Sequence, residues 1–214
     1  MFTVNKLNIT KGNIVWEERY GAEEYAYGKQ PNDFLVEQLD KIPLNNTGSK
    51  RVLCLAEGEG RNAVYLAKQG YDIVAVDASS AGMQKAQRLA LEHGVTIKTV
   101  VADLAEFEIE SESYDAVVSV FCHLPLELRQ KMHAQVVQSL RPGGVFLLEA
   151  YTPDQLKFKT GGPPVAELTI KLDDLLDEIQ GLDIISAIEK EREVIEGLYH
   201  TGMGAVVQLV AKKN

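Results

Sequence analysis

Short apolar runs alternate with longer segments of helical period between positions 51 and 151 of the chain. The apolar runs have the length of buried strands, and the segments between them repeat apolar positions every three to four residues. This alternation is typical of a parallel sheet covered by helices. The predicted strands are Arg51–Ala56, Asp72–Asp77, Thr96–Val101, Tyr114–Phe121 and Gly144–Tyr151, and the predicted helices are Arg61–Gln69, Ser79–Glu92 and Leu126–Leu140.

The two ends of the chain have a different pattern. A short helix is predicted at Leu172–Ile179, followed by two strand-like runs, Leu182–Val194 and Ala205–Lys212. Residues 196–204 are too few for a parallel crossover, so these two runs should pair antiparallel. Near the other end, residues 13–28 are rich in aromatic and charged side chains, and a helix should begin after Pro31-Asn32-Asp33 and run through Leu39. We expect one domain, 1–214, in which residues 13–41 form an N-terminal lid and helix.

The composition fits a globular protein and limits its partners. Of the 214 residues, 45% are hydrophobic and 25% charged, and the net charge is −9. An acidic chain repels phosphate backbones and anionic membranes, so neither nucleic acid nor a membrane is an expected partner. Met1–Thr10 lacks the features of a signal peptide, which predicts a cytoplasmic protein. The chain is expected to be a monomer or a homodimer. Cys54 and Cys122 lie in apolar runs and are expected to be buried thiols rather than a disulfide.

A glycine turn after the first strand is the strongest local motif. Strand residues 52–56 run into Glu57-Gly58-Glu59-Gly60-Arg61-Asn62, and a helix follows. Glycines here permit a tight turn and let the backbone approach a ligand at the carboxyl edge of the sheet. Asp77, with Ala78 beside it, ends the next strand about 20 positions after Gly58, the interval at which an acidic side chain receives ribose hydroxyls. The motif predicts a nucleoside ligand.

The identity of that ligand is left open by the motif and is decided by charge. Gly58 to Ala63 also fits the G-x-G-x-x-G/A fingerprint of dinucleotide-binding proteins. A pyrophosphate bound there would be repelled by the carboxylates of Glu57 and Glu59. S-adenosylmethionine has no phosphate. Its ammonium and sulfonium favour acidic neighbours, and its carboxylate can accept backbone N–H groups of the turn. S-adenosylmethionine is therefore the expected cofactor.

Asp103 and Leu104 close the third predicted strand. A carboxylate at this strand end can accept the amino group of an adenine held between apolar side chains. The alternative is an aspartate that only caps its own loop.

These motifs together resemble the class I S-adenosylmethionine-dependent methyltransferases. The resemblance rests on the acidic Gly-x-Gly turn, the acid ending the second strand, Ala102-Asp103-Leu104, and Leu140-Arg141-Pro142-Gly143-Gly144 before a strand. It implies a doubly wound α/β fold with a seven-stranded sheet, mostly parallel, in the order 3-2-1-4-5-7-6. The seventh strand of that order is antiparallel, which agrees with the predicted C-terminal hairpin.

Within the class the chain is similar to the small tellurite-resistance and thiol methyltransferase-like group. The similarity lies in Trp16-Glu17-Glu18-Arg19-Tyr20 and in Tyr25-x-Tyr27-Gly28-x-x-Pro31-Asn32. It implies that Trp16, Arg19 and Tyr27 belong to a lid over the cofactor. The tellurite-resistance type has a His-Arg pair in its last hairpin, where this chain has His200-Thr201. A substrate held by bidentate arginine contacts is therefore not expected.

Methyl transfer needs an oriented, desolvated nucleophile beside the donor sulfur, and sometimes a base. Phe121 and His123 follow the fourth predicted strand at the topological switch point of the sheet, where ligands bind. His123 and His200 are the candidates for the base; the alternatives are a structural or cofactor-contacting histidine at 123 and a surface-loop histidine at 200. Glu149 can line the acceptor pocket, and Arg192 can bind an anionic acceptor or lie exposed on an edge strand.

The sequence as a whole predicts an S-adenosylmethionine-dependent methyltransferase acting on a small-molecule acceptor. The group resemblance favours a soft nucleophile, such as a thiol or a selenium or tellurium compound. No His, Cys or carboxylate cluster has metal-site spacing, so no metal is expected. Two alternatives remain open: an NAD(P)-dependent oxidoreductase and a non-catalytic S-adenosylmethionine-binding regulator.

Overall fold

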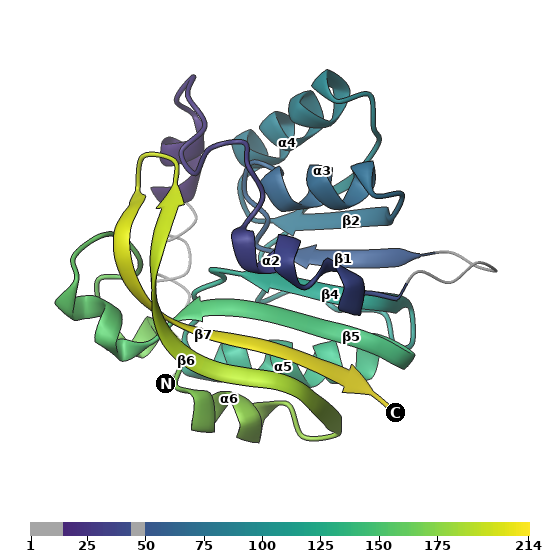
Figure 1. Ribbon diagram of the computed structural model, residues 1–214. Helices are drawn as coiled ribbons and strands as arrows, with labels where there is room; N and C mark the ends of the chain where they lie inside the picture. Colours follow the sequence, from purple (N-terminus) through teal and green to yellow (C-terminus); the bar gives the residue numbers. More distant parts are fainter. Residues whose placement is uncertain (1–14, 44–49) are drawn as a thin grey trace.

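One seven-stranded sheet organises the molecule, and its strand order is β3-β2-β1-β4-β5-β7-β6 (Figure 1). The computed structural model describes residues 15–43 and 50–214. Strands β1 to β5 run parallel, whereas β7 is antiparallel to both β5 and β6. The expected fold class is thereby confirmed. The strands are β1 Arg51–Leu55, β2 Asp72–Asp77, β3 Lys98–Val101, β4 Tyr114–Val120, β5 Leu140–Tyr151, β6 Leu182–Glu196 and β7 His200–Lys213.

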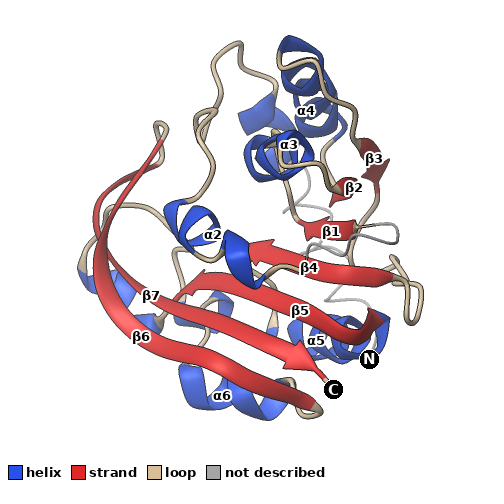
Figure 2. Ribbon diagram, turned by 45° about the vertical axis from the view of Figure 1, so that its right-hand side comes forward, coloured by secondary structure: helices blue, strands red, loops and turns tan. Residues whose placement is uncertain are grey.

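Helices cover both faces of the sheet, as Figure 2 shows. They are α2 Asp33–Glu37, α3 Arg61–Lys68, α4 Ser80–Glu92, α5 Leu126–Ser139 and α6 Leu172–Glu178. One core cluster joins α2, α3 and α4 to the sheet, and it includes Leu35, Leu66 and Leu89. A second cluster joins α5 and α6 to the opposite face. The apolar strands are therefore buried on both faces, which is why they appear in the sequence as continuous apolar runs.

The C-terminal hairpin is longer than predicted. Strand β6 extends to Glu196 and β7 begins at His200, so the turn contains only residues 197–199. Gly197 adopts a left-handed φ of 66° in this turn, a conformation that costs glycine little. The prediction missed residues 195–196 and 200–204, where Gly202 and Gly204 interrupt the apolar pattern of the second strand. The charged residues Glu189, Lys190, Glu191 and Glu193 are exposed, as expected of a solvated edge.

Three other boundaries differ from the prediction by two residues or more. Helix α2 stops at Glu37 and is followed by a single 3-10 turn, Leu39–Lys41, so the helix is shorter than expected. Strand β3 starts at Lys98, because residues 94–97 are still returning from the end of α4, where Val95 N–H donates to the Ala90 carbonyl oxygen. Strand β5 starts at Leu140, with a register irregularity before Val145.

The N-terminal segment crosses the carboxyl edge of the sheet. Residues 15–20 are helical, and the chain then runs past the tip of the β6–β7 hairpin, where Leu198 N–H donates to the Ala26 carbonyl oxygen over 2.8 Å. The expectation about Met1–Thr10 lies outside the described residues. Among residues 15–43 and 50–214, no helix is both long and apolar enough to cross a membrane.

Candidate active site

A cavity of about 1340 Å³ opens at the carboxyl ends of β1 and β4. The N-terminal segment, the hairpin tip and the loop 161–169 surround it. Two residues at its edge have left-handed backbone, Ala56 at φ 49° and Phe121 at φ 52°, and such strain is concentrated at functional sites. Nine of the predicted site residues line the cavity, namely Trp16, Arg19, Tyr27, Glu57, Gly58, Asn62, Phe121, His123 and His200.

Glu57 caps the helix that follows the glycine turn. Its Oε1 accepts the N–H groups of Asn62 over 2.9 Å and Ala63 over 2.7 Å at the start of α3. Burial raises the pKa of Glu57 to about 7, although these two hydrogen bonds and the charge of Arg61 act in the opposite direction. The helix N-terminus that would hold a pyrophosphate is thus already bonded to a carboxylate. This arrangement disfavours a dinucleotide more directly than charge repulsion alone.

Asp77 lies buried at the end of β2, 7% exposed, beside the same turn. Its Oδ2 accepts Gly58 N–H and its Oδ1 accepts Ser79 N–H, both over 2.8 Å. A carboxylate has about four lone-pair sites, so each oxygen retains capacity for a ribose hydroxyl. The residues present therefore fit the nucleoside part of S-adenosylmethionine. The hydroxyl-binding role of Asp77 remains a prediction.

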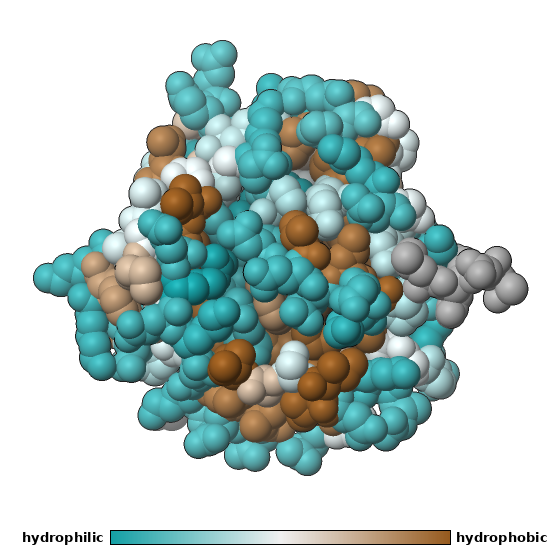
Figure 3. All heavy atoms as spheres, viewed as in Figure 1, coloured by the Kyte–Doolittle hydropathy of each residue, from teal (hydrophilic) through white to brown (hydrophobic). Residues whose placement is uncertain are grey.

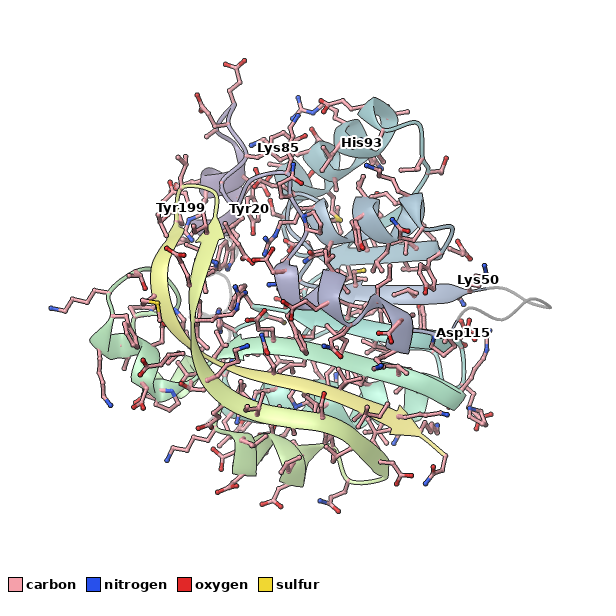
Figure 4. The ribbon with its side chains drawn as sticks, viewed as in Figure 1. Tyr20, Lys50, Lys85, His93, Asp115 and Tyr199 are labelled. Atoms are coloured by element: carbon pink, nitrogen blue, oxygen red, sulfur yellow. The ribbon has the colours of Figure 1, made fainter. Side chains whose placement is uncertain are left out.

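Tyr20 and Glu17 bring the N-terminal helix onto the turn. A Cβ at Gly58 would lie 2.7 Å from Tyr20 Oη, so the backbone there is closely covered. Glu17 Oε2 accepts the hydroxyl of Ser79 over 2.6 Å, next to the start of α4. Figure 4 shows Tyr20 on this segment, near Tyr199 at the hairpin tip. The segment lies over the glycine turn at residues 57–62, which we expect to bind the methyl donor and call the donor turn. Its function as a lid stays a prediction.

Glu59 is compensated by a buried lysine. Its Oε1 lies 2.7 Å from Nζ of Lys85, which projects from α4 (Figure 4) and is only 2% exposed. The charge of Glu59 is therefore neutralised and does not repel a pyrophosphate. The argument from charge rests on Glu57 alone. The expectation that the turn offers its N–H groups to a donor carboxylate is wrong for Gly58, Asn62 and Ala63, because Asp77 and Glu57 already accept them.

Arg19 offers a cation in place of those N–H groups. It lines the cavity, and its guanidinium lies over the rings of Trp16 at 4.8 Å and Tyr199 at 4.5 Å. Its Nη1 donates to Tyr27 Oη over 2.6 Å. Four further guanidinium donors remain for an anion such as the donor carboxylate.

Five predicted residues, Gly60, Asp77, Ala78, Asp103 and Leu104, are not among those that line the cavity. Gly60 precedes α3 with φ 91°, and a Cβ there would lie 2.5 Å from the Cβ of Ala86. Asp103 Oδ1 accepts Ala105 N–H within its own loop, and Leu104 packs in the core. Gly60 therefore serves the turn and its packing on α4, and the binding roles of Ala78, Asp103 and Leu104 remain predictions.

Aromatic rings gather near the carboxyl end of β4. We expect the acceptor on this side of the cavity and call it the acceptor side. Phe121 stacks on Tyr151, with ring centroids 4.5 Å apart, and His200 lies 4.9 Å from Phe121. His123 Nδ1 lies 3.2 Å from the Leu168 carbonyl oxygen, and burial lowers its pKa to about 3. A carbonyl only accepts, so this contact makes Nδ1 the protonated nitrogen. His123 Nε2 is buried without a hydrogen-bond partner.

The structure corrects the expected positions of Glu149 and Arg192. The Glu149 side chain is fully buried, and its two oxygens pair with Arg192 Nε and Nη2 over 2.6 and 3.0 Å. Asn32 Nδ2 also donates to Glu149 Oε2 over 2.8 Å. Neither residue lines the cavity. Arg192 is thus an internal ion partner and not an acceptor-binding group.

Comparison with known proteins agrees with this geometry. Residues 52–144 match the family model of the methyltransferase domain. Over these residues the chain is similar to methyltransferase domains, in agreement with the class I resemblance of its sequence motifs. The donor turn of the methyltransferase domain lies within the matched residues, and S-adenosylmethionine is the cofactor of the class. The resemblance found in the sequence is confirmed.

Similar proteins methylate different acceptors. A 2-heptyl-1-hydroxyquinolin-4(1H)-one methyltransferase of Mycobacteroides abscessus is 30% identical over 51% of this chain and 50% of its own length. The chain spans about half the length of the curated relatives it matches. The structure of TehB from Haemophilus influenzae has a TM-score of 0.67 at 19% identity, over 93% of this chain and 66% of that one. NodS from Bradyrhizobium japonicum, an N-methyltransferase bound to S-adenosylhomocysteine, has a TM-score of 0.68 at 12% identity, covering 94% of this chain and 97% of that one. These two likenesses show the fold.

Sequence reasoning missed several residues of the site. Glu196 and Arg61 form a buried ion pair, 2.6 Å apart, and Arg61 lines the cavity. The spacing of Glu196 and His200 around Gly197 was the available signal, because a glycine flanked by strand residues indicates a tight turn that brings its flanks together. The run Gly161-Gly162-Pro163-Pro164 marks a loop, but nothing local places that loop or Lys85 at the site, since their positions depend on the assembled fold.

Proposed function

We propose that this protein is an S-adenosylmethionine-dependent methyltransferase that transfers a methyl group to a small acceptor. The observation that carries the proposal is the pair of strand-end carboxylates. Glu57 accepts the N–H groups at the start of α3, where a phosphate would otherwise bind. Buried Asp77 accepts Gly58 N–H and keeps lone pairs for the ribose hydroxyls. That arrangement suits a donor with a ribose and a cationic amino acid part, and it disfavours a pyrophosphate.

The chain's own residues bind and orient the two reactants. Asp77 receives the ribose hydroxyls, and Arg19 receives the carboxylate of the donor. When bound, S-adenosylmethionine supplies a methyl group on a sulfonium. Phe121 and the N-terminal segment exclude water from the acceptor side, which favours reaction of a desolvated nucleophile.

For the acceptor we propose a soft nucleophile, a thiol or a selenium or tellurium compound. Support comes from the group resemblance of the lid sequence and from the likeness of the fold to TehB. The cavity supports it further, because rings and neutral imidazoles line its acceptor side and stabilise a polarizable, weakly solvated group. His123 and His200 are the candidate groups for orienting the nucleophile or taking its proton.

Calorimetric titration of the purified protein with S-adenosylmethionine, S-adenosylhomocysteine and NADH tests the donor site. We expect micromolar binding of the two sulfur nucleosides and none of NADH. The substitution Asp77→Ala should weaken binding at least tenfold through lost ribose contacts. Asp72→Ala, at the exposed opposite end of β2, is the matched control and should bind as the wild type does. Binding of NADH would support the oxidoreductase alternative instead.

Turnover separates an enzyme from a regulator. A screen of thiols, selenols and metalloid compounds with S-adenosylmethionine should yield methylated product and S-adenosylhomocysteine. Tight donor binding without product from any acceptor would favour the non-catalytic regulator.

A further inference from the structure

Glu196 and His200 face each other across the short turn of the β6–β7 hairpin. They are paired in the strand register, and both are buried, at 6% and 5% exposure. Glu196 Oε2 lies 3.5 Å from His200 Nδ1. At this distance His200 Nδ1 has no hydrogen-bond partner among the described residues. Catalytic hydrogen bonds are often loose before ligands bind and shorten when they do. A carboxylate thus stands directly behind an imidazole that lines the cavity.

Three elements hold the carboxylate of Glu196 in place. Arg61 Nη2 from α3 donates to Oε2 over 2.6 Å, and Asn32 Nδ2 donates to Oε1 over 2.8 Å. Arg192 Nη2 lies 3.6 Å from Oε1. Burial acts to raise the pKa of Glu196, but its contacts with His200, Arg61 and Asn32 hold it at about 2. Glu196 is therefore ionised at neutral pH.

The surroundings of His200 keep the imidazole itself neutral. Burial lowers its pKa below the usual value, although Glu196 acts in the opposite direction. The rings around it are Tyr27 at 4.6 Å, Phe121 at 4.9 Å and Tyr151 at 5.3 Å. The charged and titratable groups that act on it from the neighbouring elements are Glu196, Arg61, Arg19 and His123. A proton on Nδ1, facing Glu196, leaves the lone pair on Nε2.

We propose that Glu196 is a positioning residue that holds His200 as a neutral proton acceptor, so that the acceptor substrate is a protonated nucleophile and not an oxyanion. This inference rests on the proposed function. An acceptor X–H gives its proton to His200 Nε2 as the X–C bond forms and the C–S bond of the donor breaks. The products are X–CH₃, S-adenosylhomocysteine and a His200 imidazolium, whose charge Glu196 balances. Thiols, selenols and acidic hydroxyls fit this description.

His123 is less suited to the same task. No carboxylate stands behind its Nδ1, which faces the Leu168 carbonyl oxygen. An imidazolium formed there would be buried without a counter-charge, which the pKa of about 3 reflects. The two histidines therefore have different proposed roles. His200 accepts the proton of the substrate, and His123 stays a neutral ring.

Nitrogen NMR of the four histidines tests the inference without any acceptor. We expect His200 to be protonated at Nδ1 in the complex with S-adenosylhomocysteine. The substitution Glu196→Gln should lower the pKa of His200 by about one pH unit, because a charge within about 4 Å is removed. Glu193→Gln, at an exposed position of the same strand, should leave it unchanged. A His200 protonated at Nε2, or one whose pKa is equal in wild type and Glu196→Gln, overturns the proposal. If Glu196→Gln does not fold, the wild-type spectrum still decides, since it reports the tautomer.

Two thiol probes extend the test to turnover. Phenylmethanethiol is protonated at neutral pH, whereas 4-nitrobenzenethiol is ionised and needs no base. Glu196→Gln should slow methylation of the first at least tenfold and leave the second near the wild-type rate. Equal slowing of both probes contradicts the proposal. Failure of S-adenosylhomocysteine to bind any form of the protein would instead contradict the proposed function, so the two failures are distinguishable.

Discussion

Two acidic residues at the donor turn differ in what they bond. Glu57 satisfies the first N–H groups of α3, whereas Asp77 fixes the approach of Gly58 and the entry to α4. Asp77 is buried and Glu57 is half-buried, and burial raises the pKa of each carboxyl group. Burial therefore makes the ionised form of these carboxyl groups unfavourable. A cationic ligand bound beside them would stabilise that form.

The stability of the folded protein should report the state of Glu57. Its carboxyl has a pKa of about 7 in the folded protein, against a usual value of 4.5. Between these values the folded state binds more protons than the unfolded state, so this group makes the unfolding free energy fall as pH rises through that window. Glu57→Gln should flatten this part of the stability profile, measured by thermal denaturation between about pH 4.5 and about pH 7. Glu106→Gln, at an exposed site, should keep the wild-type slope; a wild-type slope in Glu57→Gln would contradict the assignment.

At the scale of elements, the hairpin tip and the N-terminal segment form one unit above the cavity. Leu198 N–H donates to the Ala26 carbonyl oxygen, and the rings of Tyr27 and His200 lie 4.6 Å apart. Gly197 makes the approach possible, since a Cβ there would lie 2.5 Å from Gly28 N. The element that carries His200 is thereby attached to the segment that covers the donor turn.

Gly197→Ala should separate these two elements. The added Cβ meets backbone, which cannot move aside cheaply, so donor affinity should fall at least tenfold in calorimetric titration. Gly94→Ala is the matched control, because Gly94 has nearly the same φ, 67° against 66°, and nothing lies within 4 Å of its added Cβ. Both variants should lose about 1 kcal/mol of stability from the left-handed backbone. Only Gly197→Ala should lose affinity, and equal affinities in the two variants would show that this contact does not support the donor site.

At the scale of the whole molecule, the sequence predicts what depends on local pattern. Periodicity locates the strands and the crossover helices, because burial on both faces leaves an unbroken apolar run. Glu57, Gly58 and Asp77 are found from spacing, since a turn and a strand end fix their positions relative to one another. The partners of Glu149, Glu59 and Glu196 are far away in the chain. Their pairing depends on the assembled sheet, so exposed charge and buried ion pair look alike in the sequence.

A network of buried polar groups connects the parts of the molecule that the sequence shows separately. Glu149 of β5 bonds to Arg192 of β6, Gln208 of β7 and Asn32 before α2. Removing one member of a buried ion pair leaves an uncompensated charge, which is more costly than the pair itself is stabilising.

Arg192→Met should therefore lower the unfolding free energy by about 3–5 kcal/mol, measured by urea denaturation at neutral pH. Arg141→Met is the control: Arg141 pairs with Asp115 over 2.9 Å but its side chain is 38% exposed, so the loss should stay below about 1 kcal/mol. Adding Glu149→Gln to Arg192→Met removes the stranded charge and should recover a large part of the loss. If Arg192→Met costs no more than Arg141→Met, the Glu149–Arg192 pair does not hold the hairpin to the parallel half of the sheet.

Because the network includes Asn32, Arg192→Met should also weaken attachment of the N-terminal segment. Donor affinity and stability should therefore fall together in Arg192→Met and recover together in the double variant.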